Sequence, residues 1–286
     1  MTTETGGCSP AQKKTATESE IRVRTGAVIT LTGILVLYFS RYAYVLEAAA
    51  AMLSIMGIVE LLRAAKCCTW YNVLLLSLIA AAVCMRRLPY YTEILLLVWV
   101  LAIVAFALFM SRMKEIHSIG FWGILPCALM LPIFFYSAVE IRRWPQGLAV
   151  LIFVTLGCTV NDVGAYFVGR AVGTHKLAPI ISPGKTVEGG LGGMVSSVIL
   201  MSLIASLYSQ CAGVEIRYGW LFLYLFLASI IGQFGDLAMS TIKRTVGIKD
   251  FSRVLPGHGG ILDRFDSFLF AAPFAVIYGN MTGCFL

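Results

Sequence analysis

Residues 220–244 read WLFLYLFLASIIGQFGDLAMSTIKR. The part before position 235 is almost wholly apolar, as expected of a helix that crosses a lipid bilayer. Asp236, Ser240 and Lys243 follow at spacings of i, i+4 and i+7, which places them on one helix face. The stretch therefore predicts a membrane helix that ends in a carboxylate, a hydroxyl and an ammonium group on the same side.

The loop after this helix continues the polar chemistry. Pro256–Gly257 and Gly259–Gly260 bracket His258, and glycines allow the backbone to approach a ligand closely. A last helix is expected to begin near Asp263. The polar residues thus gather in a loop between two predicted membrane helices.

The composition indicates a membrane protein. Of the 286 residues, 59% are hydrophobic and 13% are charged, which is typical of a polytopic membrane protein rather than of a soluble domain. The mean hydropathy is +0.85. The net charge of +7 is compatible with nucleic acid, but Lys and Arg lie between apolar runs and do not cluster with aromatic residues. We therefore expect a lipid bilayer, and no nucleic acid, as a partner.

The hydropathy pattern predicts an all-α, polytopic transmembrane protein with about nine spans. Residues 1–25 are polar and are interpreted as a disordered cytoplasmic tail. The predicted spans are residues 26–40, 43–62, 69–85, 90–111, 119–139, 146–168, 190–212, 218–242 and 266–285. The first span is short and the sixth runs into Asn161 and Asp162, so eight or ten spans stay open as alternatives.

The distribution of Lys and Arg predicts the orientation of these spans, because basic residues accumulate in cytoplasmic loops. With a cytoplasmic N-terminus, nine spans leave sixteen of the 22 basic residues inside and put six outside, namely Arg41, Arg86, Arg87, Arg142, Arg143 and Arg217. This predicts an N-terminal transmembrane scaffold at 26–145 and a C-terminal transmembrane catalytic region at 146–286. The motif loops 169–189 and 243–265 of that region would then face the cytoplasm.

The aspartates all lie in the second half of the chain, in or beside a polar motif: Asp162, Asp236, Asp250, Asp263 and Asp266. Carboxylates near apolar spans are costly, which favours a site role for Asp162 over a membrane-edge cap. For Asp250, an ion pair with Lys249 or a nearby arginine is an equal alternative. For Asp266, a charge at a helix start or a structural partner for Arg264 is a serious alternative.

The stretch 240–266, STIKRTVGIKDFSRVLPGHGGILDRFD, resembles the signature of the phosphatidate cytidylyltransferases, also called CDP-diacylglycerol synthases. The matching positions are Ser240, Lys243, Arg244, Lys249, Asp250, His258, Gly259, Gly260, Asp263, Arg264 and Asp266. The likeness extends upstream over 161–189 and is only general before that. It implies a nucleotidyltransferase of membrane phospholipid biosynthesis that converts CTP and phosphatidate into CDP-diacylglycerol and pyrophosphate.

The resemblance also implies a metal site. Hard carboxylate oxygens suit Mg²⁺, and Asp236 and Asp263 match the family's metal ligands, with or without a second, monovalent cation. The alternative is that each carboxylate only pairs with a neighbouring cation. In that case Asp263 would pair with Arg264 or Lys249, and Asp236 with Lys243.

The other candidate residues are expected to act on the phosphates or to bind the substrates. The predicted catalytic residues are Lys243, Arg244, Asp236, Asp263 and Ser240. The predicted substrate-binding residues are Asp162, Tyr166, His175, Lys176, Ser182, Lys185, Thr186, Lys249, Asp250, His258, Gly259, Gly260, Arg264 and Asp266. Residues 182–186 combine a hydroxyl, a flexible backbone and a cation, which suits a phosphate although they form no Walker A loop. For the glycines at 189, 190, 192 and 193, close helix packing is favoured over ligand contact.

Two other functions fit part of this pattern. A CTP-dependent lipid-alcohol kinase would share CTP and the metal, but would transfer phosphate instead of CMP. A transporter would line a path through the midplane with polar residues rather than crowd them at the ends of a few helices. The expected location is the inner (cytoplasmic) membrane, multi-pass, with the active site on the cytoplasmic side, and a homodimer stays open.

Overall fold

The computed structural model describes residues 10–42, 44–85, 90–112 and 121–285. Within these ranges nine α-helices form, one for each predicted apolar run. Their bounds are α1 (Pro10–Phe39), α2 (Val45–Ala64), α3 (Trp70–Met85), α4 (Tyr91–Ser111), α5 (Phe121–Arg142), α6 (Gly147–Val172), α7 (Val187–Ala212), α8 (Tyr218–Thr245) and α9 (Leu262–Thr282). The all-α prediction is confirmed.

Seven helices of the described part are long and apolar enough to cross a membrane: α1 from Glu20 onward, α2, α4, α5, α6, α7 and α8. The helix α3 is apolar but has only 16 residues. The helix α9 carries Asp263 in its first turn. Length and composition together make the protein a polytopic integral membrane protein.

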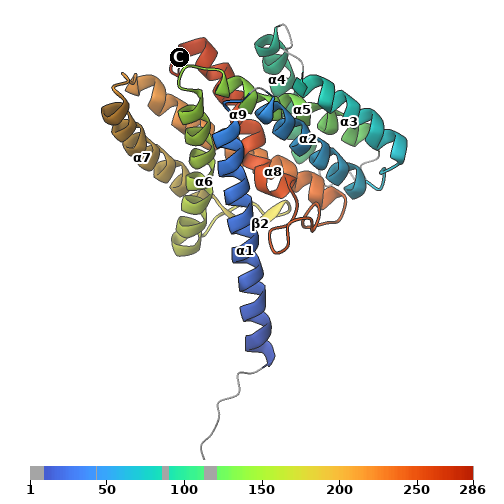
Figure 1. Ribbon diagram of the computed structural model, residues 1–286. Coiled ribbons are helices and arrows are strands. Elements are labelled where there is room, and N and C mark those ends of the chain that lie inside the picture. The colour runs from blue at the N-terminus through green and yellow to red at the C-terminus, as the bar shows by residue number, and fades with distance from the viewer. Residues whose placement is uncertain (1–9, 43, 86–89, 113–120, 286) are drawn as a thin grey trace, which may run out of the picture.

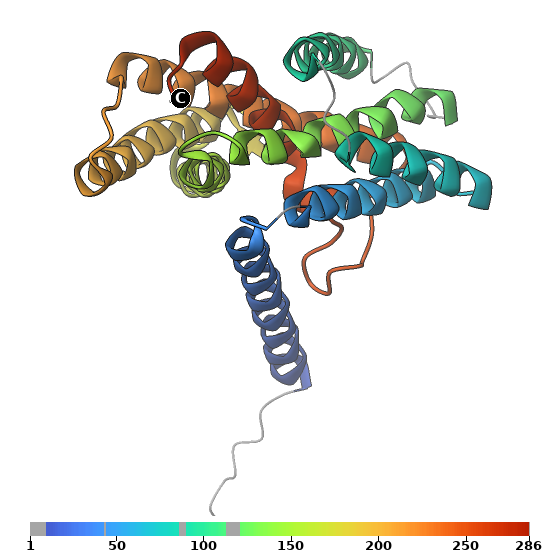
Figure 2. The same ribbon diagram turned by 45° about the horizontal axis from the view of Figure 1, so that its top comes forward.

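The helix α1 begins earlier than the sequence suggested. We expected residues 1–25 to form a disordered tail, but residues 10–25 already belong to α1. Glu18 and Glu20 each precede an arginine by four residues, a spacing that supports a helix even where the sequence is polar. Figure 2 shows α1 standing apart from the other helices, and its apolar side chains are exposed.

Several parts of the sequence predictions lie outside the described residues. These are positions 1–9 of the tail, the first positions of the spans predicted at 43–62 and 119–139, and the side chains of five residues in the charge count, namely Lys13, Lys14, Arg86, Arg87 and Lys114. The orientation in the membrane stays a prediction from the sequence.

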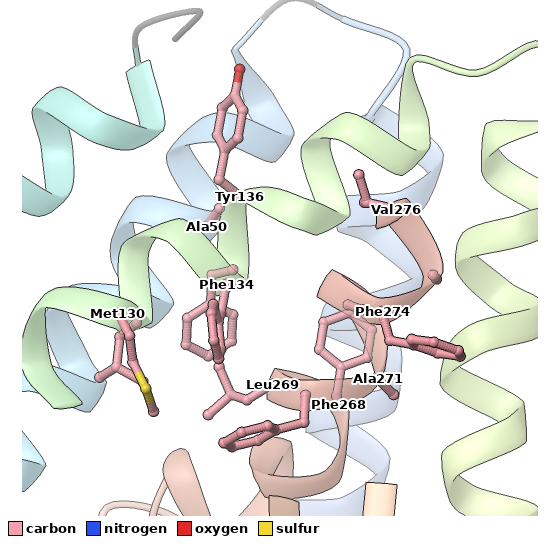
Figure 3. Close-up of a cluster of buried hydrophobic side chains, with 14 of the residues drawn as sticks. Ala50, Met130, Phe134, Tyr136, Phe268, Leu269, Ala271, Phe274 and Val276 are labelled. Carbon is pink, nitrogen blue, oxygen red and sulfur yellow. The ribbon is translucent and has the colours of Figure 1, made fainter. Parts of the chain in front are cut away.

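The helix α9 forms the centre of the bundle and packs against α4, α5, α6 and α8. Its residues from Ser267 to Gly279 are buried. Phe134 of α5 lies next to Leu269 of α9 in Figure 3, and the rings of Phe134 and Phe270 meet edge to face with centroids 5.6 Å apart. This packing fixes the position of α9 and, with it, the polar residues of its first turn.

The polar loops gather at one end of the bundle (Figure 1). One connects α8 to α9 and spans residues 246–261, and we call it the α8–α9 loop. The other connects α6 to α7. The N-terminal part of α1 extends from this same end, whereas the C-terminus lies at the opposite end.

The α6–α7 connection is not the flexible loop that its Pro and Gly suggested. It contains two antiparallel strands, β1 (Lys176–Ala178) and β2 (Ser182–Thr186), in which Lys176 pairs with Thr186 and Ala178 with Ser182. Extended pairing of so short a segment depends on its two anchored ends, which the sequence pattern does not reveal. We call this element the β-hairpin.

Candidate active site

The centre of the site is a buried ion pair between the end of α8 and the start of α9. The Lys243 Nζ lies 2.8 Å from the Asp263 Oδ1, and only 9% and 3% of the two side chains are exposed. The other oxygen of Asp263 accepts hydrogen bonds from the backbone N–H groups of Phe251 and Gly260, both at 2.9 Å. Asp263, in the first turn of α9, therefore fixes both the middle and the end of the α8–α9 loop.

The ion pairs differ from those that the sequence suggested. The alternative to a metal site paired Asp263 with Arg264 or Lys249, and Asp236 with Lys243. Instead Lys243 reaches Asp263, because the start of α9 packs directly against the end of α8. Both carboxylates thus have a cationic partner, although not the one named in that alternative, and the Mg²⁺ site at Asp236 and Asp263 stays a prediction.

The second ion pair joins Asp236 of α8 to Lys185 of β2, and each side chain remains about a quarter exposed. Ser240 donates a hydrogen bond of 3.3 Å to the Asp236 Oδ1. The predicted common face of Asp236 and Ser240 is therefore confirmed. Since β2 comes from the β-hairpin, this pair also ties the two motif regions together.

Two further carboxylates lie near Asp236. The charges of Asp162 and Asp266 are close enough to act on Asp236 and on each other. Ser267 connects them, because its hydroxyl donates to Asp162 over 3.5 Å and its N–H donates to Asp266 over 2.8 Å. Carboxylates from α6, α8 and α9 thus lie in one region, with Lys185 near Asp162 and Lys243 near Asp266.

These carboxylates do not form a complete metal site by themselves. Among the described residues, no group of three or more His, Cys, Asp or Glu side chains could hold a metal ion. Both oxygens of Asp263 are already engaged by Lys243 and backbone N–H groups. Asp236 is partly exposed and has other carboxylates nearby, so its surroundings fit a divalent ion better than those of Asp263 do.

Arg244 holds the two loops against each other. Its Nε donates to the carbonyl of Ile181, in the turn of the β-hairpin, over 3.0 Å, and its Nη1 donates to the carbonyl of Ile248 over 3.0 Å. A guanidinium offers several donors in a fixed plane, which suits such a bridge. Part of the hydrogen-bonding capacity that we assigned to phosphate is therefore used on the backbone.

The β-hairpin is fastened to α7 at its other end. The Thr186 hydroxyl caps α7 by accepting a hydrogen bond of 3.1 Å from the N–H of Gly189. The Glu188 carboxylate lies 2.5 Å from the His175 Nδ1 and accepts from the hydroxyl and N–H of Thr174. His175 thus has a local partner, and in the described part of the chain it makes no hydrogen bond to the α8–α9 loop.

The glycines at the start of α7 pack against other helices, as predicted. A Cβ at Gly192 would come within 2.4 Å of Val168, and one at Gly193 within 2.5 Å of the Asn161 carbonyl oxygen. Small residues at these positions let α6 and α7 approach each other closely.

The other predicted substrate contacts lie on exposed surface. The side chains of Lys176, Lys249, Asp250 and Arg264 are exposed, and Ser182 is partly exposed. Tyr166 is also exposed and accepts a hydrogen bond of 3.3 Å from the Arg170 Nη1. These groups are available to a ligand but are not organised into one cluster.

The tip of the α8–α9 loop needs its glycines. Gly257 and Gly259 have φ values of +76° and +84°, which side chains rarely adopt. Leu255 and Gly259 pair across this turn, with an N–H to carbonyl distance of 3.0 Å. His258 lies in the turn, close to Gly26 of α1, and its Nδ1 is buried without a hydrogen-bond partner in the described part of the chain.

The sequence did not identify two buried residues around the site. Glu60 of α2 is only 3% exposed and binds the α8–α9 loop, although its place near a helix end suggested an interfacial side chain. Gln233 of α8 donates to the Asn161 Oδ1 over 3.1 Å and to the Gly190 carbonyl over 2.9 Å. For both residues, the available signal was a polar side chain inside or beside an apolar run.

A cavity of about 300 Å³ lies among the first turns of α6, the last turns of α7 and the start of α8. Its lining is mostly apolar and includes Phe153, Ile204 and Phe285. These positions are at the end of the bundle opposite to the motif loops, so this cavity is not part of the candidate site.

Comparison with known proteins finds similar sequences in several bacteria. A protein of Bacillus subtilis (strain 168) named phosphatidate cytidylyltransferase is 40% identical over 176 residues, 61% of this chain and 63% of its own length. Proteins of the same name from Staphylococcus haemolyticus and Staphylococcus aureus (strain COL) are 47% and 46% identical over 129 residues. The alignment covers about half the length of these two relatives. Residues 20–282 match the model of the cytidylyltransferase family, and the chain belongs to that family.

Proposed function

We propose that the protein is a phosphatidate cytidylyltransferase, which forms CDP-diacylglycerol and pyrophosphate from CTP and phosphatidate. The observation that carries this proposal is the meeting of two lysine–aspartate pairs, Lys243–Asp263 and Lys185–Asp236, at one end of an apolar helix bundle. The names of the relatives support the same activity.

The proposed reaction needs no covalent enzyme intermediate. A phosphate oxygen of phosphatidate attacks the α-phosphorus of CTP, and the bond from that phosphorus to the oxygen bridging to the β-phosphate breaks. Pyrophosphate leaves with the electron pair. The nucleophile is already ionised, so catalysis can come from positioning and from charge stabilisation.

The role that we propose for each cationic residue follows from how exposed its side chain is. Lys185 is partly exposed beside the carboxylates, and we propose that it meets the triphosphate together with the exposed Lys249 and Arg264. Lys243 is buried, so we propose that it contributes a fixed positive charge just below the reacting phosphate. The acyl chains of the lipid would stay in the bilayer beside the apolar helices.

A divalent ion is the expected cofactor. We propose that Mg²⁺ binds at Asp236, since this carboxylate is partly exposed, and that Asp263 would join it only by giving up a present hydrogen bond. When bound, Mg²⁺ neutralises phosphate charge and orients the triphosphate, and it usually needs only one or two protein carboxylates.

We also propose that the site faces the cytoplasm of a bacterial inner membrane. The support is the excess of Lys and Arg at the end that carries both motif loops and the start of α1. CTP is made on that side.

Labelled CTP tests the activity. Purified protein with phosphatidate, Mg²⁺ and CTP labelled at the α-phosphorus should give labelled lipid and release pyrophosphate. Label that enters lipid only from the γ-position of CTP, with a lipid alcohol as acceptor, would instead establish the kinase. Absence of label in lipid from either position would refute both.

A further inference from the structure

Glu60 connects the N-terminal part of the chain to the α8–α9 loop. It lies in the last turns of α2 and is only 3% exposed. Its Oε1 accepts hydrogen bonds from the Ser252 hydroxyl at 2.6 Å and the Ile261 N–H at 2.9 Å, and its Oε2 accepts from the Leu262 N–H at 2.9 Å. One side chain thus holds both the middle and the end of a loop some 200 positions away in sequence.

These contacts satisfy groups that would otherwise lack partners. The first N–H groups of a helix have no acceptor within the helix, and Ile261, which precedes α9, provides no side-chain cap. Glu60 supplies the acceptor from another helix, and its negative charge suits the positive end of the α9 dipole. None of the ion pairs among the described residues involves Glu60. Its buried charge is therefore balanced by hydrogen bonds from the loop.

The neighbouring glycines leave room for this contact. A Cβ at Gly260 would lie 2.7 to 2.9 Å from the carboxylate atoms of Glu60, so only glycine allows the carboxylate to approach. On α2, the helix that carries Glu60, a Cβ at Gly57 would come within 2.9 Å of Leu262. The two glycines therefore let the end of α2 pack closely against the start of α9.

Glu60 and Asp263 bind adjacent residues of the α8–α9 loop. Asp263 holds the N–H groups of Phe251 and Gly260, whereas Glu60 holds the residues that follow each of these two in the chain. Asp263 also holds Lys243. A displacement of the Glu60 contacts must therefore move the donors on which the orientation of Asp263 depends.

We infer that Glu60 is a positioning residue, which fixes the start of α9 and the α8–α9 loop and thereby sets the place of the Lys243–Asp263 pair. The catalytic part of this inference rests on the proposed function. Among the described residues, Glu60 makes no hydrogen bond or ion pair with the exposed groups that are available to a ligand.

The test replaces Glu60 by glutamine. A glutamine side chain has the same size but presents one acceptor oxygen and an NH₂ group, so it turns a donor toward at least one of the three donors. We expect faster hydrogen exchange at the Ile261 and Leu262 amides, measured by mass spectrometry of the intact protein in detergent. We also expect kcat for CMP transfer, per folded molecule, to fall about 10- to 100-fold, as small misplacements of catalytic groups do.

A matched control is available on the same helix. The Glu47 carboxylate lies at the other end of α2 and pairs with Arg143 over 3.4 Å. Glu47→Gln should leave kcat and the exchange rates at Ile261 and Leu262 unchanged. A loss of activity that merely follows a loss of folded protein would leave kcat per folded molecule unchanged in Glu60→Gln as well.

Two milder variants keep the inference testable if Glu60→Gln does not fold. Ser252→Ala removes one of the three donors and should raise exchange and lower kcat by less. Gly260→Ala should act through the same contact, so the variant that combines it with Ser252→Ala should lose less than the sum of the two single effects.

Unchanged exchange at Ile261 and Leu262 in these variants would overturn the inference. Faster exchange with unchanged kcat would overturn the catalytic part, because the loop would then move without consequence for Lys243. If the wild-type protein forms no lipid-linked CMP, the proposed function fails, and the exchange rates alone then decide whether Glu60 holds the loop.

Discussion

Replacing Asp263 by asparagine should destabilise the protein strongly, because it leaves the Lys243 charge buried without a partner. The two side chains are 3% and 9% exposed, so water screens the charge poorly. Removal of one partner of a buried ion pair costs about 3 to 5 kcal/mol. The amide of asparagine also presents only one acceptor oxygen, so it cannot accept from Lys243, Phe251 and Gly260 in the present geometry.

A double-mutant cycle separates the ion pair from other effects. Lys243→Met keeps a long flexible side chain but removes the charge, and in combination with Asp263→Asn no unpaired charge remains. We expect the double variant to be more stable than the two single effects predict, with a coupling energy of about 2 kcal/mol. Thermal unfolding in detergent measures this, and Asp263→Asn alone should lower the midpoint by roughly 10 °C.

The outcome that would refute this reasoning is a midpoint for Asp263→Asn close to that of the wild type, or two single effects that simply add. Asp263 would then be free to act as a metal ligand, as the family resemblance implies. The control is Glu47→Gln, since the Glu47–Arg143 pair is about a quarter exposed. Its loss should cost less than about 1 kcal/mol.

Three further results are expected. Asp236→Asn should lower CMP transfer about 100-fold or more and alter its dependence on Mg²⁺. It should change the free energy of unfolding by less than about 1 kcal/mol, because the pair with Lys185 is partly exposed. Activity and melting assays with an Mg²⁺ titration check this. Gly259→Ala should cost about 1 to 2 kcal/mol, since φ is +84° there, and an unchanged melting midpoint would contradict it. In a background without native cysteines, a membrane-impermeant thiol reagent applied to intact cells should label the Arg217→Cys variant and leave the Arg253→Cys variant unlabelled. Labelling of Arg253→Cys would reverse the proposed orientation.

The helices could be predicted from the sequence because each is encoded locally. The apolar run 218–242, for example, reappears as α8 at Tyr218–Thr245. The common face of Asp236 and Ser240 was equally predictable, since it depends only on the helical repeat. The partner of Lys243 was not, because it comes from α9 and depends on how two helices pack.

The contacts of Glu60 could not be predicted from the sequence either. Its position near the end of an apolar run is compatible with an interfacial side chain, and spacing along α2 cannot reveal a loop that approaches from residues 252–262. The β-hairpin was missed for a related reason, since its strands are held by Thr186 at the start of α7 and by Arg244 of α8. In each case the decisive contact is distant in sequence.

The distribution of charge suggests how the site can exist at a membrane edge before any substrate arrives. The buried charges of Lys243, Asp263 and Glu60 are compensated: Lys243 by Asp263, Asp263 also by two backbone N–H groups, and Glu60 by three donors. Lys249 and Arg264 remain exposed and can exchange water for phosphate at little cost. A fixed, buried set of charges beneath an exposed set needs little reorganisation during the reaction, and such preorganisation stabilises a developing charge. It also makes the interior set depend on α2, so residues 26–145 contribute to the site through Glu60 rather than only as a scaffold.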